Sequence, residues 1–131
     1  MLNPTGVLLR GRAAAEALMV DACRIERKTV EATSTTSGAV TPTYLTLYEG
    51  KCRVQQHSTE ARVEDSAEQY DRMLRLEVQL PMSVVGLKVD DRITITTSAL
   101  DADLVGRQVW IRQLAHKTHA TARRVTAEEL T

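Results

Sequence analysis

The sequence predicts a mainly β fold, a small antiparallel β-barrel of about six strands preceded by a short α-helix. Residues 74–80 are apolar at every even position and polar at every odd one, which is the pattern of a strand with one buried face. Other short strand-like segments are separated by turns rich in Gly, Pro, Ser and Asp. Such a series fits a barrel or a sandwich, and 131 residues suffice for a single domain, 1–131.

The N-terminal segment 3–19 is predicted to be a helix, because a plausible N-cap and a proline precede an alanine-rich run. One face of this helix would carry Val7, Gly11, Ala14, Ala15 and Leu18. The helix packs either on its own barrel or, as an arm, on a neighbouring subunit. Leu8, Leu9 and Arg10 are candidate docking residues in the second arrangement.

The barrel is predicted over 20–126, followed by a C-terminal tail at 127–131. Its strands are expected near 21–28, 44–48, 51–55, 73–80, 93–96, 108–115 and 119–126. A Ser/Thr-rich connector is expected at 33–43. Gly50 marks either a turn or a bend within one long strand.

The long polar loop between strands 2 and 3, residues 57–71, is strongly acidic. Its acids are Glu60, Glu64, Asp65, Glu68 and Asp71, against one base, Arg62. A charged loop of this length is uncommon inside a compact domain and usually has a function.

The chain is neutral overall, with 17 bases and 17 acids, but its charge is uneven. Residues 104–127 contain no acid, and four of their arginines are the candidate docking residues: Arg107, Arg112, Arg123 and Arg124. Regional polarity in a neutral chain suits docking against complementary surfaces. A nucleic-acid-binding domain is usually basic as a whole.

No enzymatic activity, metal or cofactor is expected. His57, His116 and His119 lack the convergent spacing of a zinc site, and neither a nucleophile elbow nor a phosphate-binding loop is present. Cys23 and Cys52 occupy apolar positions of predicted strands, so buried, reduced thiols are expected. With no secretory leader and no run of about 20 apolar residues, we expect a soluble protein without a membrane partner.

A single-stranded nucleic-acid-binding barrel is the alternative from another class. Such barrels stack bases on aromatic side chains in a basic groove. Trp110 and Arg112 share a strand face and form the candidate stacking patch. A buried tryptophan in a central strand is the competing interpretation.

The order of elements, with several local segments, resembles the head-to-tail stopper (head completion, or head–tail connector) proteins of bacteriophages, most closely those of actinobacteriophages. The segments that carry the resemblance are Arg-Ala-Ala-Ala-Glu-Ala at 12–17, Cys-Arg-Ile at 23–25, the run 41–54, Leu-Val-Gly-Arg at 104–107 and 119–124. Each motif is short, and together they span nearly the whole chain.

The resemblance implies a virion neck protein that is assembled in the host cytoplasm. Copies would form a ring, of about six or about twelve, between the portal–adaptor complex and the tail terminator or tail tube. Genomic DNA would pass through the ring without sequence-specific binding, and loop 57–71 would point into the channel and help to retain it. A neighbouring ring, such as an adaptor or a tail terminator, is the alternative within this class.

Overall fold

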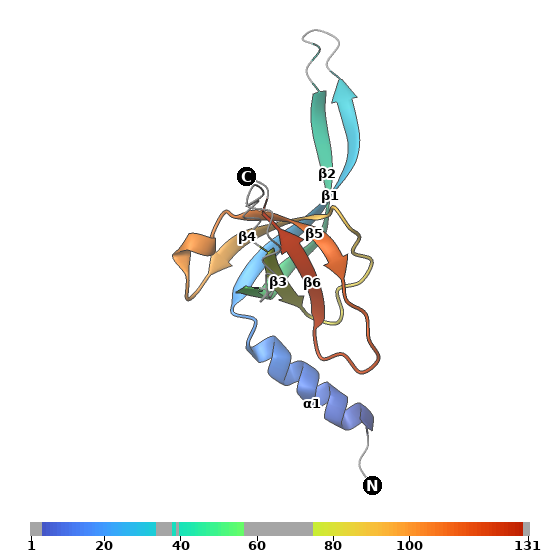
Figure 1. The fold of residues 1–131 in the computed structure, drawn as a ribbon, viewed down its shortest axis with the longest axis vertical. Helices are drawn as coiled ribbons and strands as arrows, with labels where there is room; N and C mark the ends of the chain where they lie inside the picture. The colour runs from blue at the N-terminus through green and yellow to red at the C-terminus, as the bar shows by residue number, and fades with distance from the viewer. Residues whose placement is uncertain (1–3, 34–37, 39, 57–74, 130–131) are drawn as a thin grey trace, which may run out of the picture.

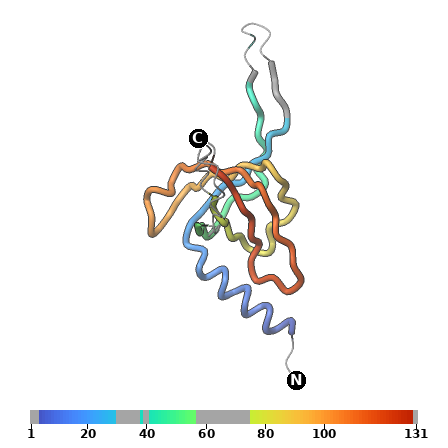
Figure 2. Tube along the Cα trace, in the orientation of Figure 1, coloured from blue at the N-terminus to red at the C-terminus, as the bar shows by residue number. Residues whose placement is uncertain are grey.

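A computed structural model of the protein describes residues 4–33, 38, 40–56 and 75–129 (Figures 1 and 2). Its elements, in order, are α1 (Pro4–Ala17), β1 (Asp21–Thr33), β2 (Val40–Gln56), β3 (Arg75–Leu80), β4 (Arg92–Ser98), the 3₁₀ helix η1 (Ala102–Leu104), β5 (Gln108–Leu114) and β6 (Arg123–Glu128). The strands close into a barrel in the order β1-β2-β3-β6-β5-β4, with every neighbouring pair antiparallel. The predicted mainly β barrel with an N-terminal helix is therefore confirmed.

The barrel interior is aliphatic. Its buried residues are Cys23, Ile25, Cys52, Leu76, Val78, Leu80, Val84, Ile93, Ile95, Val109, Ile111, Val125 and Ala127. The alternation that predicted β3 is correct, because its three even positions all face this core. Gln79, at an odd position, is also buried, and its Nε2 donates to Gln55 Oε1 at 2.7 Å.

β1 and β2 extend beyond the barrel as a two-stranded ribbon, residues 27–33 and 40–45, which projects clear of the other strands (Figure 1). Within the described residues, β1 pairs with β4 only up to Glu26, and β2 pairs with β3 only from Arg53. Much of the connector predicted at 33–43 is therefore strand. Threonine is a good strand former, and pairing with β1 draws Val40–Thr43 into β2.

β2 continues without a turn through Gly50, which pairs with Cys23. The ring of Tyr48 folds over this glycine, and its hydroxyl donates to the carbonyl oxygen of Lys51 at 2.7 Å. A Cβ at position 50 would lie 2.7 Å from the Tyr48 hydroxyl oxygen. Glycine thus makes room for the aromatic ring inside one long strand.

The last strand is displaced from its predicted position. Residues 115–122 form the connection between β5 and β6, and β6 ends at Glu128 rather than at 126. Ala127 is fully buried and Glu128 is 8% exposed, so the last strand extends into the segment 127–131 that was expected to be the C-terminal tail. Pairing of Ala127 with Ile111 and Leu76 on either side explains the difference.

A buried carboxylate fastens the base of the ribbon. Asp91 is 1% exposed, and both its oxygens accept hydrogen bonds from Arg27, from Nε and Nη2, at 2.9 Å each. The backbone N–H of Lys88 donates to the same carboxylate at 2.8 Å, and Arg27 also donates to the carbonyl of Gly86. The ribbon is thereby tied to the connection that precedes β4.

Candidate docking surfaces

α1 packs lightly against its own barrel, beside the β5–β6 connection (Figure 1). Arg12 Nε donates to the carbonyl of Ala120 at 3.2 Å, and a Cβ at Gly11 would lie 2.9 Å from Thr121 Cγ2. Lys51 of β2 pairs with Glu16 at 3.2 Å. No residue of α1 is buried, so most of the helix surface is open to a neighbour.

The face of α1 that meets the barrel differs from the predicted one. Gly11 and Ala15 are half-buried, whereas Val7 and Leu18 are 46% and 55% exposed. The contact between Gly11 and Thr121 sets the rotation of α1 about its axis. This contact cannot be read from the periodicity of the helix sequence. Of the helix docking candidates, Leu9 and Arg10 are exposed and Leu8 is half-buried.

Each of the four candidate docking arginines has a partner within the chain. Three of them pair with carboxylates: Arg107 with Glu129 at 2.8 Å, Arg112 with Asp90 and with Glu128 at 3.4 Å, and Arg124 with Glu77 at 3.7 Å. Arg123 instead donates to the carbonyls of Val84 at 3.0 Å and Met82 at 3.4 Å. Acids outside 104–127 therefore offset most of the positive charge of that segment, which the sequence alone left unbalanced.

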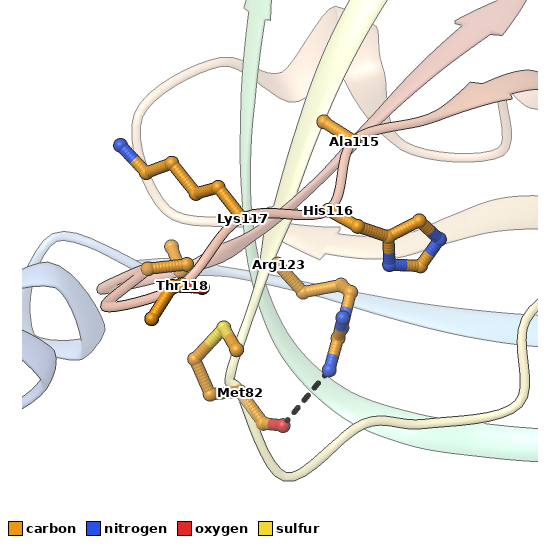
Figure 3. Close-up of a pocket in the computed structure, with 8 residues that line it drawn as sticks. Met82, Ala115, His116, Lys117, Thr118 and Arg123 are labelled. Carbon is orange, nitrogen blue, oxygen red and sulfur yellow. Dashed lines mark hydrogen bonds between the residues drawn. The ribbon is translucent and has the colours of Figure 1, made fainter.

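A pocket of about 370 Å³ lies under the β5–β6 connection (Figure 3). Its apolar lining comes from Met82, Ala115, Ala120 and Ala122, and its polar lining from His116, Lys117, Thr118 and Arg123. Arg123 reaches toward Met82, and His116 and Lys117 extend to opposite sides of the connection. We call His116, Lys117 and Arg123 the basic corner, because the pocket lining contains no acid.

The surface around η1 is acidic, in contrast to the basic corner. Residues 99–106, the η1 protrusion, stand out from the side of the barrel (Figure 2). Leu100 is 85% exposed, and the exposed Asp101 and Asp103 follow it in sequence. Asp101 caps η1, since its Oδ1 accepts from the backbone N–H of Asp103 at 3.0 Å. This surface is not among the docking residues predicted from the sequence, where the signal for it is a leucine followed closely by two acids.

The predicted channel residues, Glu60, Arg62, Glu64, Asp65, Glu68 and Asp71, lie outside the described residues. The strands on either side of them are described, and Gln56 at the end of β2 pairs with Leu76 near the start of β3. The described residues that precede and follow the acidic segment are therefore neighbours in the sheet.

Charged residues of neighbouring strands lie beside the candidate stacking patch. Trp110 of β5 is half-buried and pairs with Arg92 of β4 on one side and with Glu128 of β6 on the other. Arg112 forms ion pairs with acids. The guanidinium of Arg92 covers the ring of Tyr44 at 3.8 Å from its centroid. One face of the Tyr44 ring is therefore covered by a guanidinium, and Trp110 keeps part of its surface exposed.

Cys23 and Cys52 are free and fully buried, as predicted. A hydrogen bond with Cys52, together with burial, raises the pKa of the Cys23 thiol. Burial, followed by the two thiols and Glu16, raises the pKa of Tyr48 to about 12. In the part of the chain that the structure describes, no group of three or more potential ligands gathers for a metal, and no helix is long and apolar enough to span a membrane.

Among solved structures, the chain is similar to protein SF1141 from Shigella flexneri 2a, which was determined in solution. The TM-score is 0.51 and the identity 18%, over 83% of this chain and 90% of that one. At this identity the likeness concerns the fold alone. No curated protein matches the chain. The model of a family of unknown function, DUF6093, matches residues 11–128, and the chain therefore belongs to the DUF6093 family.

Proposed function

We propose that this chain is a non-enzymatic structural protein of a bacteriophage neck. Copies form a ring that joins the portal–adaptor complex to the tail and helps to retain and gate the packaged DNA. The observation that carries the proposal is that two elements are left over once the barrel is closed. α1 has no buried residue, and the ribbon extends past the last barrel pairing. The sequence resemblance described above gives these elements their assignment.

Such elements gain stability from neighbours. An isolated two-stranded ribbon is marginal in water, and so is a helix of 14 residues with little packing. The side chains of Leu9 in α1, Leu18 just after α1 and Leu45 in the ribbon are each more than half exposed. Contacts made on assembly would order both elements, because binding to the folded form alone stabilises it.

Within this proposal, segment 57–71 supplies the wall of the channel. Its five acids and one base give each copy a net negative charge there. Duplex DNA carries about one negative charge per 1.7 Å of its axis, so an acidic wall repels the genome and keeps it from adhering during ejection. Gln56 and Leu76, described residues on either side of the segment, pair with each other, and in the proposed ring this part of every barrel faces the axis.

The test is an image of the neck in particles of a phage that encodes this chain, together with mass spectrometry of the purified particles. We expect a ring of these barrels between portal and tail, with 57–71 nearest the axis. Absence from the particles would refute the neck assignment, and a segment on the outer wall would refute the channel role. Binding of the free chain to oligonucleotides with a steep salt dependence would instead support a single-strand-binding module.

A further inference from the structure

We propose that neighbouring copies of this chain contact each other through two specific surfaces, the η1 protrusion of one copy and the basic corner of the next. The inference rests on the proposed ring and identifies the contact that builds it. It follows from the charge and shape of the two surfaces.

The η1 protrusion offers a highly exposed leucine that is followed by two exposed acids, Asp101 and Asp103, and by the less exposed Val105. Leu100 is 85% exposed, more than the other large apolar side chains of the described residues. Among these residues, no hydrogen bond or ion pair engages the carboxylate of Asp103, whose backbone N–H and carbonyl are the groups in use. A protruding leucine with an unpaired acid beside it has the composition of an interface anchor with a polar rim.

The basic corner offers the complement. The pocket of about 370 Å³ has an apolar floor that includes Met82 and Ala122. At its edge, Arg123 is bound only to carbonyls and Lys117 to no group that the structure describes. A leucine that enters this pocket would bring its adjacent acid to these cations.

The two surfaces cannot meet within one copy. The η1 protrusion precedes β5 and the basic corner follows it, so they lie at opposite ends of that strand (Figures 1 and 2). Seven residues of strand separate them by about 20 Å. Each copy therefore donates one surface and accepts with the other, which is a head-to-tail contact. Repetition of such a contact closes into a ring when the rotation between copies allows it.

Sedimentation velocity of the full chain over a concentration series tests the contact. Asp103→Lys and Lys117→Glu are the chosen reversals, because Asp101 caps η1 and Arg123 holds carbonyls, so changes there would disturb the fold. We expect the wild type to associate and each reversal to weaken association about tenfold or more. The double variant, in which Lys at 103 meets Glu at 117, should return to within about threefold of wild type.

Glu49→Lys is the matched control, since it reverses an exposed acid elsewhere on the barrel and should leave association unchanged. A second experiment mixes two variants with one added cysteine each, one chain carrying Leu100→Cys and the other carrying Ala115→Cys. Mild oxidation of the mixture should give a disulfide-linked dimer containing one of each, because the native thiols are buried. Each variant alone should give much less.

Three results would overturn the contact: a wild type that stays monomeric throughout, a double variant without rescue, or association without the cross-link. If Lys117→Glu abolished binding of inorganic phosphate but left association unchanged, the corner would be a small-anion site and the contact would be wrong. The neck assignment is judged separately by the particles. A ring in the neck with a different contact would refute only this inference, and association without presence in particles would refute only the neck.

Discussion

Replacement of Gly50 by alanine tests the close approach of Tyr48 to the backbone of β2. The new Cβ would lie 2.7 Å from the Tyr48 hydroxyl oxygen and 3.0 Å from its Cζ, so the ring must move. Movement breaks the hydrogen bond to Lys51, which contributes about 0.5–1.5 kcal/mol net. The ring also loses packing against the core, about 1 kcal/mol. Alanine regains about 0.5–1 kcal/mol, because glycine loses more backbone entropy on folding.

The balance is a loss of about 1 kcal/mol in the free energy of unfolding for Gly50→Ala. In a Tyr48→Ala background the ring is absent, so the same change should stabilise the chain by about 0.5–1 kcal/mol. Urea unfolding of the four variants, followed by the fluorescence of Trp110, measures both values. An effect of the same sign in both backgrounds would refute the proposed steric role of Tyr48.

Three further predictions follow from the fold and the proposed role. Asp91→Asn should lower the free energy of unfolding, because the guanidinium of Arg27 and the backbone N–H of Lys88 lose their carboxylate acceptor. A urea midpoint equal to that of the wild type would contradict this. Stability should fall as pH rises from 10 to about 12, since Tyr48 ionises near its ordinary pKa of 10.0 when unfolded but near 12 when folded. Tyr48→Phe should flatten this part of the pH profile, and an unchanged slope would argue against it. Reversal of three acids in 57–71 (Glu64→Lys, Asp65→Lys, Glu68→Lys) should leave folding intact and yield particles that lose DNA or lack tails, with Glu49→Lys as control. Full DNA retention in normal particles would exclude the channel role.

The strands with strict alternation were predictable from the sequence. In β3 the even positions are aliphatic and face the core, and in β4 Ile93 and Ile95 do the same. The length of the ribbon was not predictable, because threonines suit both connectors and strands and only the partner strand decides between them. Likewise, the rotation of α1 depends on Thr121, which is more than 100 residues away in the sequence.

The surface charge around the candidate docking arginines was also not predictable from the sequence alone. Arg107 and Arg112 form ion pairs with acids 22 residues away, which the barrel register brings alongside them. A count of charge along the chain therefore overstated the basic surface. The buried Asp91 carries no sequence signal beyond a turn, since its role depends on an arginine 64 residues earlier.

The position of β6 has a consequence for synthesis of the chain. This strand fills the gap between β3 and β5, so both of those strands lack one neighbour until residue 128 has left the ribosome. The hairpin of β1 and β2 can form early, whereas closure of the sheet must wait for β6. Nascent chains would thus expose the open edges of β3 and β5 together from the completion of β5 until β6 is made, a state prone to pairing with the wrong partner.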